Sequence, residues 1–319
     1  MTRLADQCAS DVAARPHAEQ LLDITVLSGG PSAEREVSLK SGQAVASALE
    51  SQGHRIQCAD ISPDSLEALA IPADLVFVML HGKFGEDGQV QRILEARGLR
   101  YTGSDATASS IVMDKVATKS RFIEAQVPTP RFDVVTRDRV DTVLRSWCPP
   151  AVIKPISEGS SIDCVIAHDR TILRSAVEQM TDRYGRCMIE QCIEGPELTV
   201  GILGDRALPP IQIRTKRDFY DYEAKYIDND TEYLFDIDLP LAVLEEIQSL
   251  SLKAHQALGC RDFSRVDWMV DEVTHQPYAL EVNTIPGFTD HSLLPKAAQR
   301  AGIAFGQLCQ RIVDMTLSR

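Results

Sequence analysis

The chain has 319 residues, of which 44% are hydrophobic and 25% are charged. These proportions are ordinary for a soluble globular protein, and the length predicts about two domains. They exclude collagenous, coiled-coil and largely disordered proteins. The formal net charge is −13, so the chain has no overall attraction for phosphate backbones, and no run of basic residues supplies a local one. We therefore expect no nucleic-acid partner.

The cysteines and the N-terminal residues indicate a cell compartment. The eight cysteines form no CxxC pair and no Cys/His spacing typical of a zinc site, which favours reduced thiols in the cytoplasm. Residues 1–20 contain Asp6, Asp11 and Glu19 and no apolar core, unlike a signal or transit peptide. The longest apolar run, Leu75–Leu80, is far shorter than the ~20 residues of a membrane span. We expect a cytoplasmic protein without a membrane partner.

The first predicted elements are those that open a doubly wound α/β domain. A short apolar strand, Asp23–Ser28, leads through a glycine pair into a helix over Ser38–Gln52, where apolar residues recur on one face. Two further strands are expected at Arg55–Asp60 and Ala73–Leu80. In a parallel sheet, functional residues gather at the carboxyl ends of the strands, where the glycine pair and His81 stand.

The rest of the chain alternates helices with short strands. A helix over Ala106–Ala125 follows a boundary that we place near Ser104. The segment Lys216–Asp236 is dense in charged residues and tyrosine, has no clean period, and is typical of a lid. The other helices are expected at Val90–Arg97, Val140–Trp147, Thr171–Arg183, Leu241–Leu258 and Ala304–Leu317, and the other extended segments at Val127–Val135, Ala151–Lys154, Arg186–Gln191, Ser264–Val270 and Pro277–Val282.

Two segments at the ends of predicted strands have the composition of ligand-binding turns. Gly29–Glu36 begins with two glycines that let a backbone approach a ligand closely, although a plain turn before a helix is the simpler explanation. Lys154–Ser161 combines a strand-end lysine with small residues and hydroxyl groups, which suits a triphosphate, or it is a surface loop. It is not a Walker A loop, because no Gly-Lys-Ser/Thr opens a helix there.

Two predicted strands near the C-terminus carry polar residues at alternate positions. Residues two apart on a strand share a face, so Asp267 shares one with Arg265, and Glu281 shares one with Asn283. Hard oxygen ligands at this density suit Mg²⁺ between carboxylates and nucleotide phosphates, and the alternative is a pair of solvated strand faces. The loop Thr284–Ser292 follows directly, and its free amides could hold an oxyanion or a carboxylate, or form only a turn.

These patterns, in this order and spacing, resemble the D-alanine–D-alanine ligase family of ATP-grasp enzymes. The resemblance is carried by collinear stretches at 27–42, 80–88, 113–119, 152–161, 195–200, 219–226, 264–269 and 281–289. It implies an α/β, three-domain ATP-grasp fold with a doubly wound N-terminal α/β domain. The expected parts are an extension over 1–21, a substrate domain over 22–104, a central subdomain over 105–189, and a C-terminal catalytic domain over 190–319 with a lid at 216–236.

The resemblance also implies a reaction. Two D-alanine molecules and ATP would give D-alanyl-D-alanine, ADP and phosphate, for peptidoglycan precursor synthesis. The carboxylate of the first D-alanine would become an acyl phosphate, and the amine of the second would attack it. Water would hydrolyse an acyl phosphate, so a closing lid is expected. ATP and two Mg²⁺ ions, with Mn²⁺ as an alternative, would be the cofactors, and the family is usually a homodimer.

The matched motifs imply the site residues. Arg265 and the Gly287 amide would hold the tetrahedral oxyanion, and Glu34 would bind the first ammonium group. The catalytic residues implied are Glu34, Ser160, Tyr226, Arg265, Gly287 and Ser292. The further substrate contacts are His81, Lys225 and Leu293, the ATP contacts are Lys115, Lys154, Glu190, Ile193 and Glu197, and the metal ligands are Asp267, Glu281 and Asn283.

Three departures from the family pattern bear on specificity. Asp163 stands where Gly is usual, and a carboxylate there would repel a triphosphate unless it faces away or helps to bind metal. Gln191 and Cys192 replace the commoner basic and aromatic pair beside the adenine, and Asp290 replaces a Ser beside the second substrate. None of these departures removes a catalytic group, so they concern ligand preference.

Three alternatives stay open. Another carboxylate–amine ligase would keep the phosphate and metal residues and change the pockets around Glu34 and Ser292, which are intact here. A ligase that makes D-Ala–D-lactate typically lacks the lid pair Lys225 and Tyr226, whose presence favours an amine nucleophile. A regulatory nucleotide-binding protein would be expected to lose Arg265 or a metal ligand, and neither is lost.

Overall fold

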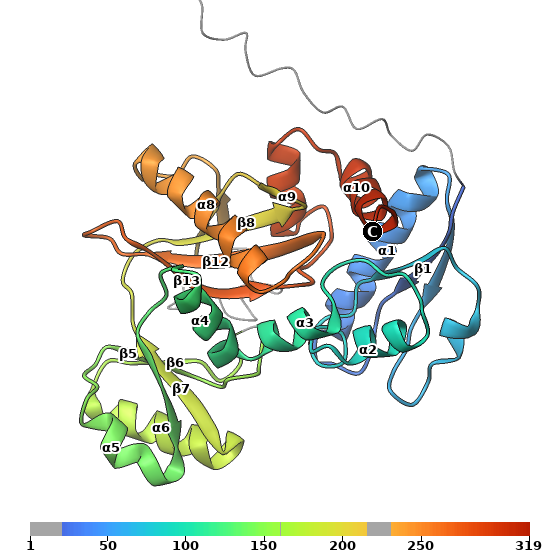
Figure 1. Ribbon diagram of the computed structural model, residues 1–319. Coiled ribbons are helices and arrows are strands. Elements are labelled where there is room, and N and C mark those ends of the chain that lie inside the picture. Colours follow the sequence, from blue (N-terminus) through green and yellow to red (C-terminus); the bar gives the residue numbers. More distant parts are fainter. Residues whose placement is uncertain (1–20, 160, 216–230) are drawn as a thin grey trace, which may run out of the picture.

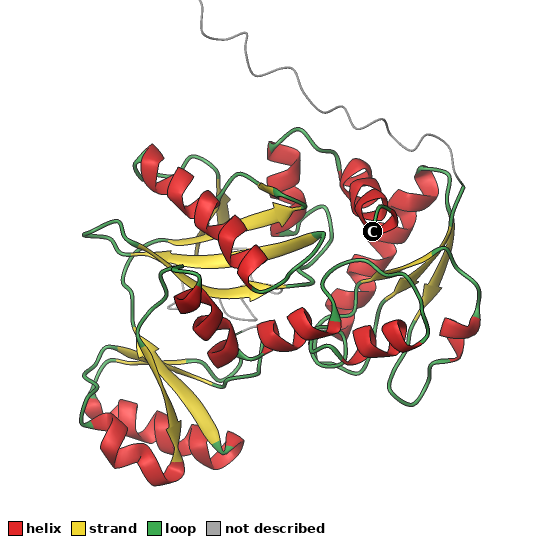
Figure 2. Cartoon of the chain, in the orientation of Figure 1, coloured by secondary structure: helices red, strands yellow, loops and turns green. Residues whose placement is uncertain are grey.

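The part of the chain that the structure describes contains three sheets, each with its own helices (Figures 1 and 2). The computed structural model describes residues 21–159, 161–215 and 231–319. The strand orders are β2-β1-β3 in the first sheet, β4-β7-β5-β6 in the second, and β11-β10-β8-β12-β13 in the third, where β9 pairs with β8.

The first sheet is parallel and confirms the predicted opening of the chain. Its strands are β1 (Asp23–Leu27), β2 (Arg55–Ala59) and β3 (Leu75–Val78). Its helices are α1 (Arg35–Ser51), the 3-10 helix η1 (Glu67–Ala70) and α2 (Gln89–Ala96). Strand β3 is buried along its whole length, as expected of a short apolar run covered on both faces.

One predicted helix is wrong, because the segment Ala106–Ala125 forms two helices. These are α3 (Ala106–Met113) and α4 (Lys115–Glu124), separated at Asp114, whose ψ of 105° is extended. The Asp114 carboxylate accepts hydrogen bonds from the second and third amides of α4, at 2.9 and 3.0 Å. An aspartate that caps a new helix competes with continuation of the old one. The break brings the first residue of α4 to the wall of a large pocket.

The second sheet is antiparallel and has its helices on one face (Figure 1). Its strands are β4 (Phe132–Thr136), β5 (Ala151–Lys154), β6 (Val165–Ala167) and β7 (Arg186–Gln191). Its helices are the 3-10 helix η2 (Arg137–Arg139), α5 (Val140–Leu144) and α6 (Arg170–Tyr184). Trp147 is buried in the core of this part.

The third sheet is antiparallel, and the sequence predicted only two of its strands, β12 (Phe263–Val270) and β13 (Pro277–Asn283). The others are β8 (Glu197–Leu203), β9 (Arg206–Ala207), β10 (Ile211–Arg214) and β11 (Glu232–Leu234). Its helices are α8 (Leu241–Ala257), α9 (Leu293–Arg300) and α10 (Phe305–Leu317). Strand β11 lies in the described end of the segment expected as a lid, and residues 216–230 of that segment lie outside the described residues.

Some contacts of the described residues run across the expected division of the chain, which stays a prediction. Helices α3 and α4, which we expected in the central subdomain, pack against β13 of the third sheet. Phe122 of α4 belongs to the same core as Trp268 of β12. The second sheet continues through Gln191, two residues beyond the expected boundary. The segment before β4 therefore belongs by packing to the third sheet, although it precedes the second in the chain.

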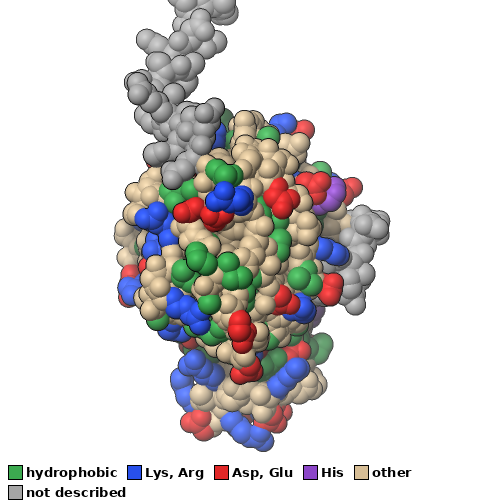
Figure 3. Space-filling view, turned by 90° about the vertical axis from the view of Figure 1, so that its right-hand side faces the viewer, with side chains coloured by type: hydrophobic (Ala, Val, Ile, Leu, Met, Phe, Trp, Pro, Cys, Tyr) green, Lys and Arg blue, Asp and Glu red, His purple; other side chains and the backbone are tan. Residues whose placement is uncertain are grey.

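The surface carries both signs of charge. On the face shown in Figure 3, basic and acidic side chains are interspersed. Among the described residues, no helix combines the length and the apolar character needed to cross a bilayer. The seven cysteines in the described part are free thiols, so packing rather than cross-linking holds this part of the chain together.

Helix α8 buries His255, which predicts a fold that weakens in acid. The His255 Nδ1 atom lies 2.7 Å from Ser264 Oγ, and burial lowers the pKa of the imidazole from 6.5 to about 4. Between these values the unfolded chain binds more protons than the folded chain, so the free energy of unfolding falls as the pH falls through the window. We expect His255 to account for a loss of about 3 kcal/mol between pH 6.5 and pH 4.

Chemical denaturation across this window measures the effect. The His255→Leu variant should lose less free energy of unfolding than the wild type as the pH falls. His168 is exposed, so the His168→Gln variant should follow the wild type. Parallel curves for the wild type and His255→Leu would contradict the assignment.

Candidate active site

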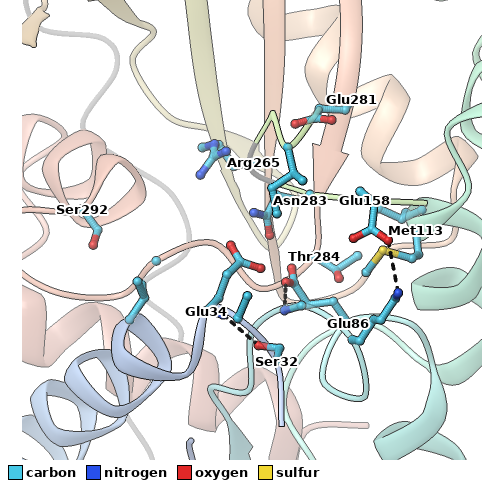
Figure 4. Close-up of a pocket in the computed structure, with 18 of the residues that line it drawn as sticks. Ser32, Glu34, Glu86, Met113, Glu158, Arg265, Glu281, Asn283, Thr284 and Ser292 are labelled. Carbon is cyan, nitrogen blue, oxygen red and sulfur yellow. Dashed lines mark hydrogen bonds and ion pairs between the residues drawn. The ribbon is translucent and has the colours of Figure 1, made fainter. Parts of the chain in front are cut away.

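A pocket of ≈ 750 Å³ gathers residues from the neighbourhood of all three sheets (Figure 4). Its walls come from the start of α1, the loop after β3, the loop after β5, and strands β12 and β13 with the loop that follows them. Among the residues that line it are eight predicted from the sequence: Glu34, Lys115, Arg265, Glu281, Asn283, Gly287, Ser292 and Leu293.

Strands β12 and β13 place the predicted metal ligands side by side. They pair antiparallel, so that Arg265 lies opposite Asn283 and Asp267 lies opposite Glu281, with a bulge after Asp267. Both oxygens of Asp267 accept hydrogen bonds: Arg265 Nε and Nη2 each donate at 2.8 Å, and Thr199 Oγ1 of β8 donates at 2.6 Å. The paired, nearly buried guanidinium of Arg265 is thereby fixed in orientation.

Lys115, the first residue of α4, contacts two other segments of the chain. Its Nζ lies 3.3 Å from Glu281 Oε2 of β13 and donates at 2.6 Å to the Glu158 carbonyl oxygen in the loop after β5. The Glu158 carboxylate in turn lies 3.1 Å from Lys83 Nζ in the loop after β3 (Figure 4). A cation at a helix N-terminus attracts anions, and this one stands at the pocket wall.

One carboxylate is shared by two lysines beside this wall. Glu190 of β7 pairs with Lys154 at the end of β5 and with Lys119 of α4, whose Nζ lies 2.9 Å from Glu190 Oε2. Burial would raise the pKa of Glu190, but the two ammonium groups hold this pKa below its ordinary value. Burial lowers the pKa of Lys119 to about 8. For Lys154 burial also acts to lower the pKa, but Glu190 outweighs it and the pKa lies above its ordinary value.

The glycine pair before α1 forms a turn that brings Glu34 to the pocket. Gly29 and Gly30 have φ of 88° and 76°, a region that glycine adopts without strain. A Cβ on Gly29 would lie 2.5 Å from Asp60 Oδ1, to which the Gly30 amide donates at 2.9 Å. Glu34 is the N-cap residue of α1, and its carboxylate points into the pocket (Figure 4). The tight turn and the ligand-binding role are therefore compatible.

Phe288 anchors the loop that carries Gly287 and Ser292. Its ring is fully buried, with its centroid 6.2 Å from that of Phe77, and its amide donates to Ser41 Oγ of α1 at 3.1 Å. A Cβ on Gly287 would come within 3.2 Å of Ser292 Oγ, so the loop leaves little room for a side chain there. Amides fixed in this way can hold an anion without reorganising.

The other predicted site residues within the described part of the chain are not among those that line the pocket. Asp267, Lys154 and Glu190 are buried in the pairs described above. His81 is buried with its Nε2 3.2 Å from Ser41 Oγ, and burial lowers the pKa of the imidazole. Ile193 and Glu197 lie just after β7 and at the start of β8. Ser160, Lys225 and Tyr226 lie outside the described residues.

Asp163 faces helix α6. Its Oδ2 atom lies 2.6 Å from Arg183 Nη1 and accepts a hydrogen bond from the Tyr184 hydroxyl. Its φ of 56° lies in the left-handed region that favours glycine, which is the residue the family pattern has here. The Asp163 carboxylate is thus paired with α6, which agrees with the expectation that it faces away from a triphosphate bound at residues 154–161.

This placement predicts that Asp163 is replaceable. The Asp163→Gly variant loses an exposed ion pair but relieves a left-handed backbone, and exposed pairs contribute about 1 kcal/mol or less. For ATP, the nucleotide that the resemblance implies, we expect KM to change less than about fivefold. Steady-state kinetics measures this, and a large rise in KM would mean that Asp163 takes part in binding ATP.

Of the other two departures, Gln191 and Asp290 are exposed, and Cys192 is half-buried. Gln191 is exposed at the end of β7. The Asp290 carboxylate is exposed, with Oδ1 3.6 Å from His291 Nε2. Neither side chain lines the pocket, so neither changes the residues that bind there directly.

The sequence reasoning missed Glu86. This carboxylate lines the pocket and accepts a hydrogen bond from the Gly82 amide at 2.6 Å. Glu86 lies inside one of the matched stretches, residues 80–88, directly after a buried strand. A carboxylate between Gly85 and Gly88, in the loop that follows a buried strand, was the signal that could have identified it.

Two family models match this chain. The model for the D-ala D-ala ligase C-terminus covers residues 123–314, and the model for the D-ala D-ala ligase N-terminus covers residues 57–104. The chain belongs to the D-alanine–D-alanine ligase family. This membership confirms the ATP-grasp fold class and the enzyme class, an ATP-dependent ligase, that the sequence predicted.

Family members cover nearly the whole chain. The D-alanine–D-alanine ligase of Hydrogenovibrio crunogenus is 42% identical over 301 residues, which is 94% of this chain and 96% of the relative. The crystal structure of D-alanine–D-alanine ligase from Bacillus anthracis complexed with ATP has a TM-score of 0.78 at 33% identity, and covers 93% of this chain and 98% of its own. The VanG D-Ala:D-Ser ligase of Enterococcus faecalis has a TM-score of 0.82 at 26% identity, with 93% and 100% covered.

Proposed function

We propose that this pocket joins two molecules of D-alanine, with ATP, into D-alanyl-D-alanine for peptidoglycan synthesis. The observation that carries the proposal is the β12–β13 pair, which sets Arg265 beside Asp267 and Glu281 beside Lys115 at one wall. A carboxylate is a poor electrophile, so it must be converted to a mixed anhydride before an amine can attack it. Phosphoryl transfer needs positioned positive charge, and this wall provides it.

The ATP end of the site uses the lysines. Lys115 and Lys154 contact the phosphates. This role is supported by their position beside the loop after β5, where carboxylates and a carbonyl oxygen fix their ammonium groups. One carboxylate balances two buried lysines, which leaves a net positive charge for the triphosphate. Glu190, Ile193 and Glu197 lie along the adenosine.

The metal ligands are Asp267, Glu281 and Asn283. Mg²⁺ prefers oxygen ligands and usually combines one or two carboxylates with phosphates and waters. The paired strands supply two carboxylates and an amide oxygen on neighbouring positions, which fits this preference. When bound, Mg²⁺ neutralises the charge that develops on the transferred phosphoryl group.

The substrates lie between Glu34 and the loop after β13. Glu34 binds the ammonium group of the first D-alanine, with Ser160 and Tyr226 in the same set, and His81 lies close to the carboxylate. Ser292 and Leu293 hold the carboxylate of the second D-alanine. Lys225, which lies outside the described residues, is assigned to substrate binding by the family motif.

The second step forms the peptide bond. The amine of the second D-alanine attacks the acyl phosphate carbonyl, and negative charge builds on its oxygen. Arg265 and the Gly287 amide stabilise this oxyanion, since both are held rigidly before the reaction. Collapse of the tetrahedral intermediate expels phosphate. Exclusion of water by a closed lid protects the acyl phosphate from hydrolysis.

A substrate panel tests the proposal. The purified protein, ATP and Mg²⁺ are given D-alanine, L-alanine, D-serine or D-lactate, singly and with D-alanine, and phosphate release and product mass are measured. We expect D-alanine alone to support release, with a product of dipeptide mass, and D-alanine with D-lactate to give little ester. If the main product contains D-serine, the protein has the second-substrate preference named for the Enterococcus faecalis relative. If the main product is the ester with D-lactate, the protein is a D-Ala–D-lactate ligase. Release with none of them would contradict the proposal.

We infer a cytoplasmic homodimer. The free thiols of the described part agree with a reducing compartment. Light scattering of the purified protein measures its mass in solution, and a mass of one chain would contradict the dimer.

A further inference from the structure

The loop after β3, which lines the pocket together with Glu34, has a strained backbone. Phe84 is buried and has φ of 74°, a region that a bulky residue rarely adopts. The conformation is stabilised by Asp87, whose Oδ2 accepts from the Phe84 amide at 3.0 Å. A Cβ on Gly85 would lie 2.0 Å from the Leu80 carbonyl oxygen. Strain of this kind persists where the surroundings enforce it, often at functional sites.

The strained turn directs Glu86 back toward the start of its own loop. The Glu86 amide donates to the Gly82 carbonyl oxygen at 2.8 Å, and the Gly82 amide donates to Glu86 Oε2 at 2.6 Å. Figure 4 shows this side chain reaching the region where the Glu34 carboxylate points. A Cβ on Gly82 would lie only 2.9 Å from Glu34 Oε2. The two carboxylates therefore flank a single glycine.

Two charged or titratable groups of the described residues face Glu86 besides Glu34. From β12 comes Arg265, whose guanidinium already donates twice to Asp267. His81 lies in the same loop as Glu86, and burial lowers the pKa of its imidazole. Burial and Glu34 raise the pKa of Glu86 to about 8, against the lowering effects of the Gly82 and Ile285 amides and of Arg265.

We propose that Glu86 is a second functional carboxylate, which keeps a proton in the empty pocket and releases it to solvent when a substrate ammonium group binds beside it and Glu34. Two neighbouring carboxylates cannot both ionise readily without a cation. An ammonium group supplies that cation, so the O–H bond of Glu86 breaks and its proton leaves. A hydroxy acid brings no such charge. The inference rests on the proposed function, which assigns Glu34 to the first ammonium group.

Calorimetric titration measures the released proton. D-alanine is titrated into the full-length protein with Mg²⁺ and a non-hydrolysable ATP analogue, at pH 7, in buffers of different ionisation enthalpy. The wild type should release about one proton for each chain whose first D-alanine site is filled. Release should fall steeply by pH 9, because Glu86 is then already ionised. D-lactate in place of D-alanine should cause no release.

Two glutamate variants complete the design. Glu86→Gln should lose the release at pH 7, whereas Glu246→Gln, an exposed position on α8, should behave as the wild type. Binding without proton release in the wild type, or equal release by Glu86→Gln, would overturn the inference. The wild-type pH profile decides the question even if Glu86→Gln does not fold.

A product assay on the same preparation separates the two claims. Dipeptide formation without proton release would overturn the role of Glu86 and leave the proposed function standing. Absence of both D-alanine binding and dipeptide would overturn the proposed function, and the role of Glu86 with it.

Discussion

Replacing Arg265 by alanine should lower kcat at least about 100-fold, because the proposed function makes its guanidinium a donor to the oxyanion. The effect is large because the guanidinium is preorganised: Asp267 holds Nε and Nη2 at 2.8 Å, and only 9% of the residue is exposed. The change also removes two hydrogen bonds to Asp267, whereas the one from the Thr199 hydroxyl remains. Steady-state kinetics with saturating ATP and D-alanine measures the loss.

Two further variants separate charge from geometry. Arg265→Lys keeps the positive charge but not the planar fork, so we expect kcat to stay close to that of Arg265→Ala. Arg311 is exposed on α10, and Arg311→Ala should match the wild type. A kcat within about threefold of the wild type for Arg265→Ala would show that Arg265 does not stabilise the transition state.

Replacing Lys154 by methionine should raise KM for ATP roughly 10- to 100-fold, because a charge-assisted contact to phosphate is worth about 1.5–3 kcal/mol. The same change removes one of the two ammonium groups that pair with the buried Glu190. Loss of one partner of a buried carboxylate is costly, so we also expect the free energy of unfolding to fall by about 3 kcal/mol. Kinetics and denaturation of one preparation measure both effects.

The control for this variant is the same substitution at a lysine on the surface. Lys253 is exposed on α8, and Lys253→Met should change neither KM nor stability appreciably. Loss of stability with unchanged KM would give Lys154 a purely structural role and contradict its place at the phosphates.

The local sequence pattern predicted strands and helices correctly where burial and periodicity agree. The apolar runs of β1, β3 and β5 and the alternation of β12 and β13 were readable in this way. The single helix expected over Ala106–Ala125 failed because the capping chemistry of Asp114 overrides a pattern of helix-forming residues. Strand β8 was missed although it is almost wholly buried and stands between Gly195-Pro196 and Gly204-Asp205, because periodicity alone does not distinguish a short apolar strand from a buried helix segment.

Side chains on regular strands were easier to predict than side chains on turns. The alternation on β12 and β13 predicted which faces Arg265 and Asn283 share with their neighbours. The position of Glu86 depends on a left-handed backbone at Phe84, which no residue preference signals. The pairing of Glu190 with Lys119 joins separate elements, so it required the tertiary structure.

Isotope transfer tests the central claim, that the site activates a carboxylate through an acyl phosphate. D-alanine labelled with ¹⁸O in both carboxylate oxygens is incubated with the protein, ATP and Mg²⁺, and the released phosphate is analysed by mass spectrometry. If the first carboxylate attacks the γ-phosphate, that oxygen leaves with phosphate when the peptide bond forms. The account predicts one ¹⁸O in each phosphate released with the dipeptide, and phosphate without ¹⁸O would contradict it.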